Sequence, residues 1–238
     1  MPLILNIETA TQICSVGLSD NGNIIAIRET NEQRSHASRV TVFIEEVFKE
    51  AGISLNAIDA VAVSMGPGSY TGLRIGVSTA KGLCFALDKP LIAVSTLESL
   101  AWGMREIVKE RIPGNNEKLI FCPMIDARRM EVYQAMFDML MNPLTATVAD
   151  IIDEHSFFEL LKSHTMMFAG DGSAKCKSLF EGQANAVFMD DVQPSACFMA
   201  PLSDKHFINS NFENTALFEP FYLKDFIAGK PKVKGLGN

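Results

Sequence analysis

The sequence lacks the cysteine spacings that metal sites and disulfide frameworks require. Its five cysteines are an odd number, and no two of them form a Cys-x-x-Cys pair. This pattern argues against a structural zinc site and against a set of paired disulfides. It favours a reducing compartment, and we therefore expect a cytoplasmic protein.

Basic charge is also scarce. The chain has 21 Lys and Arg residues against 28 Asp and Glu residues, so its formal net charge is −7. A protein that grips nucleic acid by itself usually shows a basic excess, because phosphate contacts dominate that affinity. The average charge therefore favours a small-molecule or protein partner.

No run approaches the roughly 20 apolar residues of a membrane helix, and the first residues carry no basic segment, so we expect neither a membrane span nor a signal peptide.

Two classes of hydrolase are disfavoured by what is missing. The four histidines, at 36, 155, 164 and 206, include no pair spaced three or four residues apart, as a helical zinc site needs. Residues 62–66 (AVSMG) only loosely resemble a serine-hydrolase nucleophile elbow, since the first glycine is absent. We expect no metal site and no serine nucleophile.

What the first half does contain is strongly patterned secondary structure. Asp20-Asn21-Gly22 predicts a tight hairpin, because Asn and Gly tolerate positive φ. Apolar residues at spacings of three and four predict helices, and short apolar runs predict strands. The order is β-β-β-α-β-α-β-α, with strands at 3–8, 13–19, 23–29, 59–65 and 91–95 and helices at 36–51, 70–87 and from 96.

The second half repeats this string of elements. Strands are predicted at 119–125, 130–138, 144–149, 165–169 and 186–190, and helices at 155–163, 174–181 and beginning within 195–199. A doubled β-β-β-α-β-α-β-α topology predicts the α/β, two-lobed actin-like ATPase fold, the superfamily of sugar kinases and RNase H-like proteins (ASKHA). A solvated stretch near 108–118 places the lobes at 1–108 and 109–238. Whether the C-terminal tail packs back on the first lobe stays open.

The stretch Gly66–Gly72 (GPGSYTG) is the most informative motif. It joins a buried strand to a helix, where backbone N–H groups can hold an anion. Its spacing matches neither the Walker A motif nor the dinucleotide fingerprint, and Pro67 removes a donor. Three interpretations stay open: a tight turn whose glycines allow close packing, a polyphosphate site, and a contact with a partner.

Other loops could face an interlobe cleft in such a fold. The candidate contacts of a degenerate nucleotide or phosphate site are Glu8, Thr9, Thr11, Gly68, Ser69, Gly170 and Gly172, with ordinary turns as the alternative. Asp126–Arg129 (DARR) can orient a ligand or a partner, or form surface ion pairs. The basic tail 224–238 can touch an anionic partner or simply fray.

The helices 36–51 and 70–87 are apolar on more than one side. Gly72, Gly76 and Ala80 recur every four residues, which lets another backbone approach closely. Surplus apolar surface indicates a subunit contact, and a thoroughly buried pair of helices is the alternative.

At these motifs the chain resembles the TsaB (YeaZ) family. The resemblance rests on Ile7–Thr11 (IETAT), Arg34–Ser38 (RSHAS), Gly66–Gly76 (GPGSYTGLRIG), Asp126–Arg129 and Glu219–Asp225 (EPFYLKD), and it extends over nearly the whole chain. Glu8 departs mildly from the family pattern, because many members have Asp there.

The resemblance implies a cytoplasmic, non-catalytic scaffold or activator subunit. Such a subunit binds TsaD and TsaE in the formation of threonylcarbamoyladenosine next to the anticodon of tRNA, meets tRNA indirectly through the complex, and can form a homodimer when isolated. No cofactor is expected, except ATP or ADP at an interface of the complex. An ATP-dependent phosphotransferase is the alternative function, and a peptidase is a third function that is less favoured. The partner interface would include His36, Val40, Phe43, Val47, Tyr70, Leu73, Gly76, Val77, Ala80 and Cys84.

Overall fold

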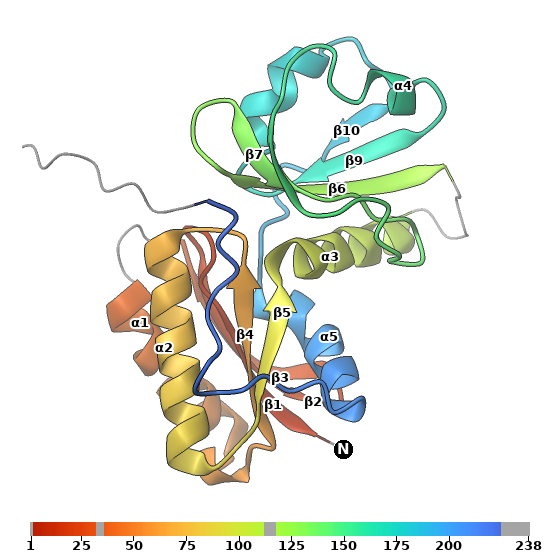
Figure 1. The fold of residues 1–238 in the computed structure, drawn as a ribbon. Helices are drawn as coiled ribbons and strands as arrows, with labels where there is room; N and C mark the ends of the chain where they lie inside the picture. Colours follow the sequence, from red (N-terminus) through yellow and green to blue (C-terminus); the bar gives the residue numbers. More distant parts are fainter. Residues whose placement is uncertain (1, 32–35, 112–117, 225–238) are drawn as a thin grey trace, which may run out of the picture.

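The fold consists of two five-stranded mixed sheets with the same internal topology (Figure 1). It was obtained as a computed structural model that describes residues 2–31, 36–111 and 118–224, with the side chains of His36 and Arg111 excepted. The first sheet has the strand order β3-β2-β1-β4-β5 and the second has the order β10-β9-β6-β7-β8. The two halves of the chain therefore share one arrangement, in which the first strand of each half, β1 or β6, lies at the centre of its sheet. This confirms the predicted duplicated, two-lobed actin-like fold.

The first lobe closely follows the sequence pattern. Asn21 and Gly22 both have positive φ, at 49° and 71°, as the hairpin between β2 and β3 requires. The elements are β1 (Leu3–Glu8), β2 (Cys14–Asp20), β3 (Asn23–Thr30), α1 (His36–Ala51), a 3₁₀ turn η1 (Leu55–Ala57), β4 (Ala60–Gly66), α2 (Tyr70–Leu87), β5 (Leu91–Ser95) and α3 (Thr96–Arg111).

In the second half of the chain, several elements are shorter than the sequence predicts. The elements of this half are β6 (Leu119–Asp126), β7 (Glu131–Gln134), β8 (Val148–Ile151), α4 (Phe158–Leu161), β9 (Thr165–Ala169), η2 (Ala174–Phe180), β10 (Ala186–Phe188) and α5 (Ala196–Ile208). The strand predicted at 130–138 ends at Gln134, because Phe137 turns to exchange both backbone hydrogen bonds with Phe121. The helix predicted at 155–163 is a single turn, and that at 174–181 is a 3₁₀ helix.

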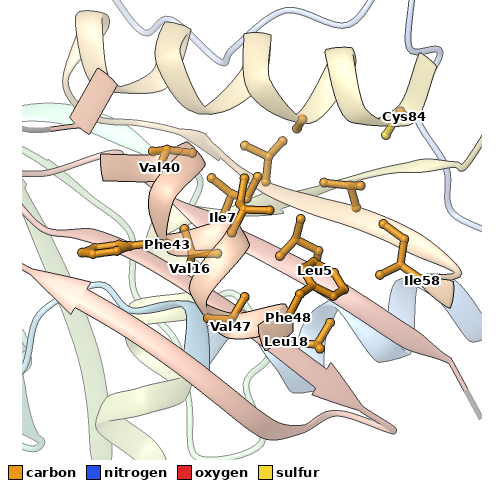
Figure 2. Close-up of a cluster of buried hydrophobic side chains, with 14 of the residues drawn as sticks. Leu5, Ile7, Val16, Leu18, Val40, Phe43, Val47, Phe48, Ile58 and Cys84 are labelled. Carbon is orange, nitrogen blue, oxygen red and sulfur yellow. The ribbon is translucent and has the colours of Figure 1, made fainter. Parts of the chain in front are cut away.

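Helices cover both faces of the first sheet. On one face, Leu5, Ile7 and Val16 point towards the buried side of α1, and α2 lies beside it over the same cluster (Figure 2). On the other face, Met199 and Leu202 of α5 pack against strand residues such as Ile4 and Ile92. Because both faces are covered, β1, β2 and β4 are almost continuously buried.

The last helix of each half packs against the sheet of the other half. The buried side of α3 meets Phe121 and Ile125 of β6, whereas α5 lies on β1 of the first sheet. Two buried polar contacts position α5: Ser203 Oγ donates to Asn6 Oδ1 at 2.7 Å, and the Ala196 amide donates to Ser15 Oγ at 2.9 Å. The boundary between lobes at 108/109 stays a prediction, but α5 is packed as part of the first lobe.

The segment after α5 returns along the first lobe. The amide of Glu213 donates to the Leu91 carbonyl at 2.9 Å, and that of Phe221 donates to the Met65 carbonyl at 2.7 Å. Lys81 Nζ on α2 donates to the carbonyl oxygens of Ala216 and Phe218. We call residues 213–224 the C-terminal strap; Figure 1 shows it in dark blue, crossing β5 and then rising beside α2.

Candidate functional site: the interlobe cleft

A cleft of about 910 Å³ lies between the two lobes. The first lobe lines it with the corner after β1 and the glycine-rich turn before α2. The second lobe contributes the turn after β6, together with Tyr133 and Asp171. The end of the strap, Phe221–Lys224, forms a further part of the wall. The motifs singled out in the sequence therefore converge on one cavity, although only some of their side chains reach it.

Glu8 is fully buried and does not line the cleft. Its Oε1 accepts a hydrogen bond from the Ala10 amide at 2.6 Å, and its Oε2 has no hydrogen-bond partner among the described residues. Complete burial raises the pKa of this carboxyl to about 7, against the lowering effect of the Ala10 and Ser64 hydrogen bonds. Near neutral pH the side chain is therefore partly protonated, which makes it poorly suited to hold a cation–phosphate pair.

The corner after Glu8 is occupied by packing contacts. Thr9 is buried, and its hydroxyl donates to the Gly72 carbonyl at 2.9 Å. Thr11 is also nearly buried but borders the cleft, as do Ala10 and Gln12. Of the candidate contacts on this corner, Thr11 lines the cavity, whereas Glu8 and Thr9 do not.

The glycine-rich turn packs tightly on the same corner. The Ser69 amide donates to the Ala10 carbonyl at 2.6 Å, and Ser69 Oγ caps α2 by accepting from the Gly72 amide. A Cβ at Gly68 would lie 2.3 Å from the Ala10 carbonyl oxygen, and one at Gly72 would lie 2.1 Å from that of Thr9. Because these glycines have no side chain, the turn can approach the corner after β1 closely. This favours the packing interpretation of the motif.

The turn after β9 is built in the same way. Gly170 has φ of +96°, and a Cβ there would lie 2.3 Å from the Met124 carbonyl oxygen. A Cβ at Gly172 would lie 2.8 Å from the Ile125 carbonyl carbon. Neither glycine lines the cleft. Between them, Asp171 does, and its Oδ1 accepts from the Asp126 amide at 2.9 Å. Burial raises the pKa of the Asp171 carboxyl above its ordinary value.

The residues predicted to meet a partner are mostly inside the first lobe. Gly76 faces Thr9, because a Cβ there would lie 2.2 Å from Thr9 Oγ1. Its replacement by a large residue would therefore disturb the fold of the first lobe. Tyr70 is partly exposed, and the His36 side chain is outside the described part. The buried members are Val40, Phe43, Val47, Leu73, Gly76, Val77, Ala80 and Cys84. Their role at an interface stays a prediction.

The outward side of the same helices was missed by the sequence analysis. Phe85 on α2 is 88% exposed, and Val42 on α1 is 40% exposed. Thr71, Ser78 and Gly82 are also exposed and share the side of α2 that carries Phe85. A helical period of 3.6 already separates positions 71, 78, 82 and 85 from the inner positions 73, 77, 80 and 84. The sequence therefore distinguishes the two sides of α2, but nothing in it says which side faces the sheet.

No group of three or more His, Cys, Asp or Glu side chains that can hold a metal ion occurs within residues 2–31, 36–111 and 118–224. The described helices also include none that is both long and apolar enough to cross a membrane. All five cysteines are free thiols, and burial raises the pKa of Cys14 and Cys84 to about 11. A raised pKa disfavours the reactive thiolate form of Cys14 and Cys84 at neutral pH.

Fold and cleft together define a two-lobed actin-like protein in which the corner after β1 and the glycine-rich turn pack against each other. Three comparisons identify the family. A family model described as TsaD, tRNA N6-adenosine threonylcarbamoyltransferase, matches residues 23–228. A curated relative from Escherichia coli K12, named tRNA threonylcarbamoyladenosine biosynthesis protein TsaB, is 31% identical over 95% of this chain and 96% of its own length.

Two further relatives agree. The Haemophilus influenzae protein of the same name is 28% identical over 95% of both chains. The solved structure of YeaZ from Pseudomonas aeruginosa superimposes with a TM-score of 0.74 and 27% identity, covering 94% of this chain and all of that one. The chain belongs to the TsaB family.

Proposed function

We propose that this protein acts in the biosynthesis of threonylcarbamoyladenosine in tRNA as a non-catalytic subunit. It binds TsaD through the outward sides of α1 and α2 and supports the transfer reaction that TsaD performs. TsaE joins the assembly, tRNA is engaged through the complex, and a second copy of the chain can take the TsaD position when the protein is isolated. A cytoplasmic location is part of the proposal.

The observation that carries this proposal is the exposed outward side of α2. Phe85 leaves 88% of its surface in solvent, next to residues small enough to let another backbone approach. On the inner side the same helix is anchored by Leu73, Val77 and Cys84, which are 1%, 4% and 2% exposed. The helix is thus held rigidly by its own lobe and offers the opposite side for association.

The non-catalytic part of the proposal draws support from the cleft. The Ser69 amide and the Thr9 hydroxyl already have protein partners. Gly68 and Gly72 have no room to reposition, because carbonyl oxygens lie against them. A polyphosphate would therefore find few free donors on this corner. The phosphotransferase alternative requires micromolar binding of Mg·ATP by the isolated chain, which titration calorimetry can measure.

The test compares two phenylalanines. Phe85→Glu places a charge at the centre of the proposed interface, whereas Phe158→Glu makes the same change at a half-exposed site on α4. Both variants should keep the thermal stability of the parent, since neither side chain is buried. In co-purification with TsaD from the same organism, Phe85→Glu should lose at least about ten-fold in affinity, as central interface residues do. Equal retention by both variants would rule out this surface.

A further inference from the structure

All three tyrosines of the chain line the interlobe cleft. They are Tyr70 at the start of α2, Tyr133 on β7 and Tyr222 on the strap, so each comes from a different segment. The rings of Tyr70 and Tyr222 lie 5.0 Å apart, and Phe221 borders the same cavity. Tyr222 and Phe221 are 36% and 40% exposed, so these rings are accessible from the cleft. Aromatic walls of this kind favour a flat ring as ligand.

The rim of the cleft is basic, although the protein as a whole is acidic. Arg128 lines the cavity, and Arg129 follows it at the exposed tip of the β6–β7 hairpin. Neither guanidinium forms an ion pair with any residue that the structure describes. Across the cleft, the Arg74 guanidinium lies 4.6 Å above the Tyr70 ring.

The acidic groups nearby are largely neutralised. Lys175 pairs with Asp126, and Lys224 pairs with Glu131. The remaining carboxyl in the wall, Asp171, is mostly buried and already accepts a backbone hydrogen bond. The uncompensated charge at this rim is therefore positive, and it is carried by arginines, whose planar guanidinium binds phosphate and stacks on bases.

The hairpin that presents the arginines has an unusual backbone. Arg128 and Arg129 both have positive φ, at 73° and 53°, in a turn where Asn-Gly would be favoured. The turn is closed by the hydrogen bond from the Glu131 amide to the Arg128 carbonyl. Arginine is a poor choice for the turn itself, which indicates that its side chain is there for contact with something outside the hairpin.

We propose that the interlobe cleft binds an unpaired nucleotide of single-stranded RNA, with the base against the tyrosine rings and its phosphate on Arg128. This rests on the proposed function in tRNA modification, which supplies an RNA as substrate, and it adds a direct contact between this chain and RNA to the engagement of tRNA through the complex. Stacked aromatic side chains and arginines are the means by which proteins hold unstacked bases. A single phosphodiester suits the cleft better than a triphosphate, because the donors of the glycine-rich turn are occupied.

The experiment measures fluorescence anisotropy of a short, labelled, single-stranded RNA titrated with the full chain. Two comparisons identify the ligand. The same RNA annealed into a duplex tests whether the base must be unpaired, and unlabelled ATP as competitor tests whether a free nucleotide occupies the cleft instead. Arg128→Gln should weaken binding about ten-fold and reduce the slope of log affinity against log salt by about 0.7, the value for one phosphate contact. Lys162→Gln removes one exposed charge immediately after α4 and should change neither quantity.

The tyrosine wall is tested with two variants at one position. Tyr222→Leu should weaken binding about ten-fold through lost stacking, whereas Tyr222→Phe keeps the ring and should stay close to the parent. Thermal unfolding of each variant establishes that the strap is retained. Because the tyrosines all line the cleft, their emission in a Trp102→Phe background should fall when the single-stranded RNA is added.

Four results would overturn the proposal: no saturable binding of the single strand, equal binding of the duplex, displacement by ATP at equimolar concentration, or equal effects of Arg128→Gln and Lys162→Gln. Phe85→Glu should leave RNA binding intact. Failure at the cleft is thereby distinguishable from failure of the proposed TsaD interface.

Discussion

The packing role of the glycine-rich turn can be tested with one methyl group. Gly72→Ala places a Cβ 2.1 Å from the Thr9 carbonyl oxygen, a distance that real Cβ atoms do not reach. The neighbour is backbone, which cannot rotate away as a flexible side chain would. Either α2 or the corner after β1 must move, and the hydrogen bond from Thr9 Oγ1 to the Gly72 carbonyl is lost or weakened.

The expected magnitude follows from these two contacts. Overpacking of this kind costs about 1–3 kcal/mol, and losing the Thr9 hydrogen bond costs about 1 kcal/mol more. We therefore expect Gly72→Ala to lower the free energy of unfolding by about 2–4 kcal/mol. Since 1 kcal/mol shifts Tm by about 2–4 °C in a chain of this length, Tm should fall by roughly 5–15 °C.

The same helix provides a matched control. Gly82 on α2 is exposed, and a Cβ there meets no atom within 4 Å. Gly82→Ala should therefore stabilise the protein by about 0.5–1 kcal/mol, because alanine loses less backbone entropy in a helix. One substitution, made at two positions ten residues apart, is thus expected to have opposite signs.

The assay is urea unfolding followed by circular dichroism, with the midpoint compared at a common slope. If Gly72→Ala is neutral or stabilising, as Gly82→Ala is expected to be, then the turn has room to move. The packing interpretation would be refuted, and a ligand-binding role for the glycines would regain support.

Two further predictions concern buried polar groups. The pKa of Glu8 is raised from 4.5 to about 7, so the native state favours the protonated form; stability should therefore fall by roughly 3 kcal/mol as the pH rises from about 4.5 through about 7. Denaturation at pH 5 and pH 8 should show most of this loss in the parent. If the loss persists in Glu8→Gln, it belongs to another titrating group. Ser195 Oγ caps α5 by accepting from the Cys197 amide and donates to Glu29 Oε1 on β3, so Ser195→Ala should destabilise the protein by about 1–2 kcal/mol. Urea unfolding of the exposed-site variant Ser163→Ala serves as the comparison, and equal midpoints would show that this link does not hold α5 in place.

Most of the first lobe was predictable because its signals are local. The Asn21-Gly22 turn, the apolar runs of β1 and β4 and the periodicity of α1 each specify an element without reference to the rest of the chain. In the second lobe the segments are shorter, and Phe137 ends β7 early through a pairing with Phe121 that is distant in sequence. Short segments depend on such tertiary contacts, which periodicity does not encode.

The candidate site was harder to predict than the fold. Sequence periodicity showed that α2 is apolar on more than one side, but not that Leu73 faces the core while Phe85 faces solvent. Thr9 and Gly72 were both noted, yet their contact joins residues 63 positions apart. The strap has no periodic pattern, since it belongs to no helix or sheet and includes a turn at residues 215–217. Its contribution of Tyr222 to the cleft could only come from the structure.

The duplicated topology does not make two independent halves. Ile4, Ala62 and Ile92 in the first sheet are fully buried, and the helix packed against them is α5, from the end of the chain. In return, α3 supplies Leu97, Leu100 and Met104 to the core under the second sheet. The strap then adds a further connection, from Lys81 on α2 to Glu131 on β7. Because these elements fix how the lobes meet, they also fix the shape of the cleft, and a change in α5, which does not line the cleft, should still alter the shape of the cleft.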